Sequence, residues 1–103
     1  MTLTLLCTVD DVPTGQAMRV ELAEIDVAVV RVADEIFAME DVCSHAEFPL
    51  SEGDVDGCTI ECALHGSRFD LRTGKSSGPP ATAPINVFPV SVLDGDVYIE
   101  LEN

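Results

Sequence analysis

Residues 43–65, CSHAEFPLSEGDVDGCTIECALH, decide how this chain is interpreted. Cys43 and His45 form a C-x-H group, and Cys62 and His65 form a C-x-x-H group after sixteen intervening residues. The chain's only two histidines both belong to this pattern. Thiolates and imidazoles are common ligands of transition metals. The pattern therefore predicts a metal site formed by these four side chains.

The order of the ligand types indicates which metal is bound. Each group supplies one cysteine and one histidine, so one iron can take both thiolates and a second iron both imidazoles, as in one kind of [2Fe–2S] centre. A structural zinc site is the main alternative, although zinc ligands are usually spaced as C-x₂₋₄-C and H-x₃₋₅-H. Zinc would make the chain a metal-stabilised interaction module. A visible spectrum that bleaches with dithionite distinguishes iron–sulfur from zinc.

The composition is typical of one small, acidic domain. The chain has 103 residues, of which 47% are apolar, and this length is close to the common domain size. Five basic residues against nineteen acidic ones give a net charge of −14. Like charge repels nucleic acid and anionic membrane surfaces, so we expect neither as a partner. The acidic charge serves either solubility or docking onto a basic partner.

The hydrophobic pattern predicts an all-β chain. Helical periodicity is not sustained over any eleven-residue window, whereas short apolar runs alternate with turn residues. Asp94 and Gly95 predict the turn of a hairpin. The strand-like runs are 3–9, 17–22, 27–33, 36–39, 85–93 and 97–101. This spacing favours a small antiparallel sandwich or barrel.

The metal-binding pattern lies in a segment of different composition. Residues 41–70 have one basic residue against seven acidic ones and contain several turn signals. We interpret them as a cluster-binding subdomain of two loops on short strands. It is inserted into a basal β subdomain, formed by 1–40 and 71–103, of a single domain that covers 1–103. The Pro-rich stretch 74–84 follows, where a stiff loop could shield a cluster from water.

The two ligand groups and their flanks resemble a known family. CSHAEFPLSEG (43–53) and CALHGSRFDLRTG (62–74) resemble the two ligand boxes of Rieske ferredoxins, and 79–90 is similar to the loop and strand that follow in those proteins. The resemblance is greatest to the soluble Rieske ferredoxins of bacterial multicomponent aromatic-ring-hydroxylating dioxygenases. It implies the three-sheet Rieske iron–sulfur fold and one [2Fe–2S] cluster. It also implies electron transfer from an NAD(P)H-dependent flavoprotein ferredoxin reductase to a terminal Rieske non-haem iron oxygenase.

The resemblance also assigns roles around the cluster. Respiratory Rieske proteins join their loops by a disulfide, but the matching positions here are Phe48 and Leu64, which we expect to cover the cluster with apolar surface. Ser67 is expected to hydrogen bond a cluster sulfur, whereas Phe69 lacks the hydroxyl found at that position in respiratory proteins. With one donor fewer, the reduction potential should lie toward the lower end of the Rieske range.

The number of histidines distinguishes an electron carrier from an oxygenase. A mononuclear iron triad needs two further histidines, and the chain has none, so we expect an electron carrier without catalytic residues. A small subunit of another redox enzyme, such as nitrite reductase, is the alternative.

Cys7 is interpreted as a buried hydrophobe and Cys58 as a turn residue without a role. No targeting segment or membrane span is visible, so we expect the cytoplasm.

Overall fold

The computed structural model describes residues 2–23, 25–42, 49–62, 67–76 and 84–101. These residues form strands and two short 3-10 helices, with no α-helix among them. The elements are β1 (Thr2–Thr8), η1 (Val9–Asp11), β2 (Ala17–Glu21), β3 (Asp26–Val32), β4 (Glu35–Glu40), η2 (Leu50–Glu52), β5 (Asp54–Asp56), β6 (Thr59–Glu61), β7 (Arg68–Asp70), β8 (Val87–Phe88), β9 (Val90–Leu93) and β10 (Asp96–Leu101). Within the described ranges, no helix has the length and hydropathy needed to cross a membrane.

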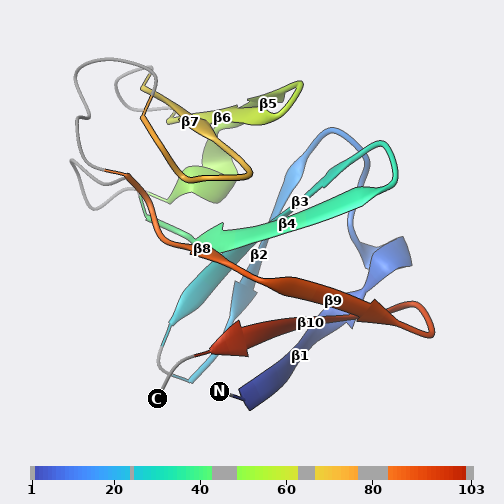
Figure 1. Ribbon diagram of the computed structural model, residues 1–103. Helices are drawn as coiled ribbons and strands as arrows, with labels where there is room; N and C mark the ends of the chain where they lie inside the picture. Colours follow the sequence, from blue (N-terminus) through green and yellow to red (C-terminus); the bar gives the residue numbers. More distant parts are fainter. Residues whose placement is uncertain (1, 24, 43–48, 63–66, 77–83, 102–103) are drawn as a thin grey trace.

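The strands form three antiparallel sheets, which confirms the predicted fold class. Their orders are β1-β10-β9, β2-β3-β4-β8 and β5-β6-β7. In Figure 1 the four-stranded sheet lies in the middle, with β5–β7 above it and β1, β9 and β10 below. The small upper sheet lies entirely within the segment 41–70. The division of the chain into a basal and a cluster-binding subdomain stays an interpretation.

The near-continuous apolar run of β3 has a structural cause, because both faces of this strand are buried. Val27 and Val29 face the lower sheet, whereas Ala28 and Val30 face the upper one. A strand covered on both faces needs apolar residues at consecutive positions. The basal core consists of Val12, Val27, Val29, Ala38 and Ile99. The upper core consists of Ala28, Val30, Met39, Leu50, Ile60, Cys62, Phe69, Leu71 and Ile85.

One predicted strand was wrong. The run 85–93 is divided at Pro89, since β8 pairs with β4 in the middle sheet while β9 pairs with β10 in the lower sheet. Proline has no amide hydrogen and cannot donate to a continuous ladder. The predicted hairpin is confirmed, and Asp94 and Gly95 both have positive φ, at 52° and 81°. Positive φ at both central residues is the geometry of a type I′ hairpin turn.

Candidate metal centre

One of the four predicted ligands is placed by the structure. Cys62 directly follows β6, whereas Cys43, His45 and His65 lie outside the described residues, as do the predicted covering residues Phe48 and Leu64. Within the described ranges, no three His, Cys, Asp or Glu side chains converge on a possible metal position. The centre is therefore built here from the residues that flank each ligand group.

The second ligand group is flanked by a hairpin. The Cys62 N–H donates a hydrogen bond of 2.7 Å to the Ser67 carbonyl, directly beyond the last β6–β7 pair, Glu61 with Arg68. This bond fixes the two residues on either side of 63–66. The ladder thus places Cys62 and Ser67, which flank 63–66, at the end of the small upper sheet.

The environment of Cys62 suits a soft metal. Its side chain is fully buried within the upper core and forms no disulfide. Ser67, across the closing bond, is also buried, at 1% exposure. A buried thiol that forms no disulfide fits a thiolate ligand, and a buried hydroxyl five residues later fits a hydrogen-bond donor to the cluster. These described residues fit an iron–sulfur cluster.

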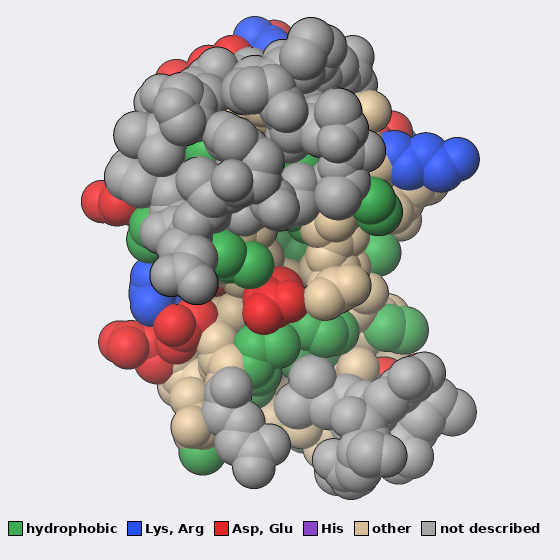
Figure 2. All heavy atoms as spheres, turned by 90° about the vertical axis from the view of Figure 1, so that its left-hand side faces the viewer, with side chains coloured by type: hydrophobic (Ala, Val, Ile, Leu, Met, Phe, Trp, Pro, Cys, Tyr) green, Lys and Arg blue, Asp and Glu red, His purple; other side chains and the backbone are tan. Residues whose placement is uncertain are grey.

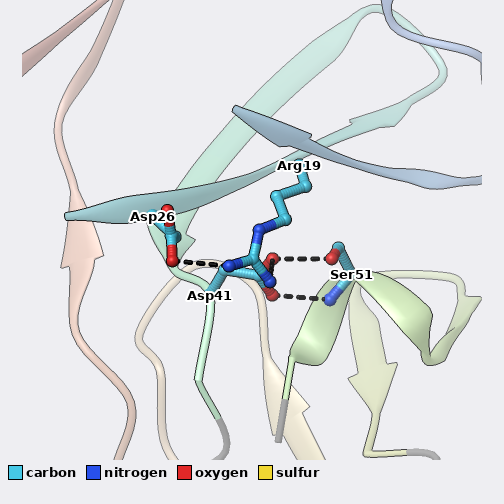
Figure 3. A network of polar contacts seen from close by, with 4 residues as sticks. All are labelled: Arg19, Asp26, Asp41 and Ser51. Carbon is cyan, nitrogen blue, oxygen red and sulfur yellow. Dashed lines mark hydrogen bonds and ion pairs between the residues drawn. The ribbon is translucent and has the colours of Figure 1, made fainter. Parts of the chain in front are cut away.

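The first ligand group is flanked by a buried carboxylate that the sequence analysis missed. Asp41 Oδ1 accepts the Ser51 N–H at 2.7 Å, and Oδ2 accepts the Ser51 hydroxyl at 2.6 Å (Figure 3). Asp41 Oδ2 also lies 3.6 Å from Nη1 of Arg19, which pairs with Asp26 as well. Asp41 and Ser51 thus join the two sides of the segment that contains Cys43 and His45. The available signal was an acid just before the first ligand and a serine after it.

Two glycines allow close backbone contacts near the ligand groups. A Cβ on Gly53 would lie only 1.8 Å from the carbonyl oxygen of Glu61, the residue before Cys62. Gly74 has a φ of +79°, and a Cβ there would lie 2.2 Å from the Ile85 carbonyl oxygen. The Ile85 N–H donates to the Gly74 carbonyl at 2.8 Å. This last bond joins both sides of 77–83, where the predicted shielding lies outside the described residues.

The remaining cysteines have different surroundings. Cys7 is half-buried against the basal core, and burial, with a smaller contribution from the charge of Asp11, raises the pKa of its thiol. Cys7 therefore packs against apolar residues as predicted, but it is half-buried where full burial was expected. Cys58 occupies the two-residue turn between β5 and β6, as predicted, and its sulfur accepts a hydrogen bond of 3.0 Å from Arg72 Nη1. The contact with Arg72 was not predicted.

The arginines on β7 and in the turn after it are paired with acids. Arg68 lies 3.4 Å from Asp56 and 3.3 Å from Glu61, and Arg72 lies 3.0 Å from Glu35. Acidic side chains appear at several points around the described part of the face in Figure 2. The acids of the chain outnumber its bases by nineteen to five, so these pairs leave a large excess of negative charge.

Comparison with known proteins shows the family. A model of the Rieske [2Fe-2S] domain matches residues 2–89. The chain belongs to this family, and its relatives include ferredoxin subunits. The biphenyl dioxygenase ferredoxin subunit of Pseudomonas sp. (strain KKS102) is 43% identical over 101 residues, which cover 97% of this chain and 93% of that protein.

Solved structures agree with the sequence comparison. The Sphingomonas yanoikuyae B1 ferredoxin superposes with a TM-score of 0.92 at 34% identity, covering 98% of this chain and 100% of that one. A ferredoxin chain in the complex of reduced oxygenase and oxidized ferredoxin of carbazole 1,9a-dioxygenase gives a TM-score of 0.89 at 39% identity. That match covers 97% of both chains. The predicted Rieske fold is thus confirmed.

Proposed function

We propose that this chain is the ferredoxin component of a multicomponent aromatic-ring dioxygenase system. The observation that carries this proposal is the near full-length match to dioxygenase ferredoxin subunits, at 43% identity. Those relatives are named as ferredoxin subunits of dioxygenases. The chain accordingly carries one electron at a time and leaves the oxygen chemistry to its partner.

The proposed function requires ligands for a single [2Fe–2S] cluster, and two Cys and two His form a suitable donor set. Cys43 and Cys62 would supply thiolates to one iron, and His45 and His65 would supply imidazoles to the other. The cluster, when bound, is a one-electron acceptor with a potential between roughly −150 and +300 mV. Cys62 lies in an apolar core, which would keep water away from its thiolate. Ser67 is the candidate donor to a cluster sulfur, and Phe48 and Leu64 are the candidate apolar cover.

The partners proposed are an NAD(P)H-dependent ferredoxin reductase and a terminal oxygenase. A relative at 39% identity forms a complex with its oxygenase, which supports the second partner. The net charge of −14 favours docking onto basic surfaces of both proteins, because opposite charge speeds association. Selection of the aromatic substrate falls to the oxygenase, which binds it.

Spectroscopy and reconstitution test this function. The purified protein is expected to show a visible spectrum that bleaches with dithionite, with two irons and two sulfides per chain. It should then support electron flow from a purified dioxygenase reductase to a purified terminal oxygenase. A colourless protein with bound zinc would contradict the proposal. Stable co-purification with a large redox enzyme would favour the small-subunit alternative.

A further inference from the structure

The carboxylate of Asp41 is buried and fully engaged. Its side chain has no exposed surface, and both oxygens accept hydrogen bonds from Ser51. Burial of a charged group is unfavourable unless hydrogen bonds and an opposite charge compensate it. Asp41 is two residues before Cys43, and Ser51 follows the same ligand group. The buried charge of Asp41, which is unfavourable by itself, therefore lies where its hydrogen bonds connect the two ends of the first ligand loop.

Arg19 supplies the opposite charge from another strand of the middle sheet. This residue lies on β2, and its guanidinium reaches both Asp26 on β3 and Asp41 beyond the end of β4 (Figure 3). The Asp41 N–H also donates to the Asp26 carbonyl at 2.9 Å. These contacts connect the base of the first ligand loop to the β2–β3 hairpin. Arg19 is 37% exposed, so it can be substituted without opening a core.

We propose that Asp41 and Arg19 are positioning residues of the metal centre. Asp41 holds the first ligand loop to Ser51. Arg19 balances the negative charge of Asp41, so that this charge does not oppose reduction of the cluster. This inference rests on the proposed function, because it concerns the cluster that the function requires. Neither residue is proposed to bind iron.

The proposal predicts the direction in which each charge shifts the reduction potential. Reduction adds one negative charge to the centre, so an unbalanced carboxylate nearby disfavours reduction. A charge in a buried place acts over a lower effective dielectric than one on the surface. Removal of the Asp41 charge should therefore raise the potential, whereas removal of the Arg19 charge should lower it. A purely mechanical brace would not give opposite signs.

The experiment compares holoprotein variants by spectroelectrochemistry and by cluster loss to a chelator. Asp41→Asn is expected to raise the midpoint potential and Arg19→Gln to lower it. Arg19→Lys should restore the potential of the unmodified chain. Ser51→Ala keeps both charges but removes one hydrogen bond to Asp41, so it should release the cluster on the order of tenfold faster with little change in potential.

Glu35→Gln is the matched control for charge. Glu35 is an exposed, ion-paired acid at the other end of β4, about 20 Å from Asp41 along the strand, so its loss should change neither readout. Potentials that shift in the same direction for Asp41→Asn and Arg19→Gln, or not at all, would overturn the inference. If Asp41→Asn fails to hold the cluster, Arg19→Gln and Arg19→Lys still decide it. An unmodified chain without iron and sulfide would instead overturn the proposed function.

Discussion

The basal core and the upper core lie on opposite faces of β3 but differ in what surrounds them. The basal core contains only aliphatic side chains. The upper core contains the thiol of Cys62, and both polar side chains that are buried among the described residues, Asp41 and Ser67, flank the ligand groups on that side. Burying polar groups costs free energy, and a sandwich does not need them for folding. The basal core therefore stabilises the fold, and the upper core is also the proposed support of the metal centre.

The largest difference between the two cores should come from their cysteines. Cys62→Ser is expected to abolish the cluster, with near-complete loss of visible absorption and bound iron, and to destabilise the chain because metal binding is coupled to folding. Cys7→Ser changes a half-buried thiol beside the basal core and should leave the iron content unchanged. Iron analysis and absorption spectra of both variants test this. Equal iron loss in the two would contradict the division between the cores.

A second comparison removes a large side chain from each core. Leu50 and Ile99 are both fully buried, the first in the upper core and the second in the basal core. Substitution of either by Ala should reduce the free energy of unfolding by about 2–5 kcal/mol. At equal loss of stability, Leu50→Ala should release the cluster faster, because Leu50 belongs to the same core as Cys62. Denaturant unfolding and chelator kinetics on the two holoproteins measure this. Release rates that follow global stability alone would argue against it.

Substitution of two glycines by Ala is expected to have a smaller effect on the free energy of unfolding. Gly53 has an ordinary backbone conformation, but a methyl group there would overlap the Glu61 carbonyl next to Cys62. Gly53→Ala should cost about 1–3 kcal/mol and loosen the cluster. Gly95→Ala has open space around it in the lower hairpin and should cost about 1 kcal/mol through its positive φ, without cluster loss. Thermal unfolding followed at a cluster absorption band and by circular dichroism separates the two effects.

The sequence predicted those parts of the molecule that depend on local pattern. Apolar alternation and turn residues gave the all-β class and the hairpin at Asp94 and Gly95, and the resemblance gave the three sheets. The run 85–93 was wrongly predicted as one strand, because two strands of different sheets follow one another there. Only Pro89 marks the change between them. Strand pairing is a long-range property, and a continuous apolar run does not reveal which sheet each half joins.

The contacts around the ligand groups could not be predicted from the sequence, because they depend on tertiary structure. Ligand identity could be predicted from residue type and spacing, since few side chains bind iron. The contact between Asp41 and Arg19 joins residues more than twenty positions apart. An acid and a base at that distance in an acidic chain have no special pattern. Their importance follows from burial, which the sequence around Asp41 does not indicate.

The smallest expected effect concerns the pH dependence of the basal core. Burial raises the pKa of Cys7, so the folded chain holds this thiol proton more tightly than the unfolded chain does. The resulting stability is complete below the pKa of an unfolded thiol, about 8.5, and is lost as the pH rises through the folded pKa. The difference in unfolding free energy between the unmodified chain and Cys7→Ser should therefore be constant below about pH 8 and decrease at higher pH. A difference that stays constant across this alkaline range would show that the Cys7 thiol is not held protonated by the fold.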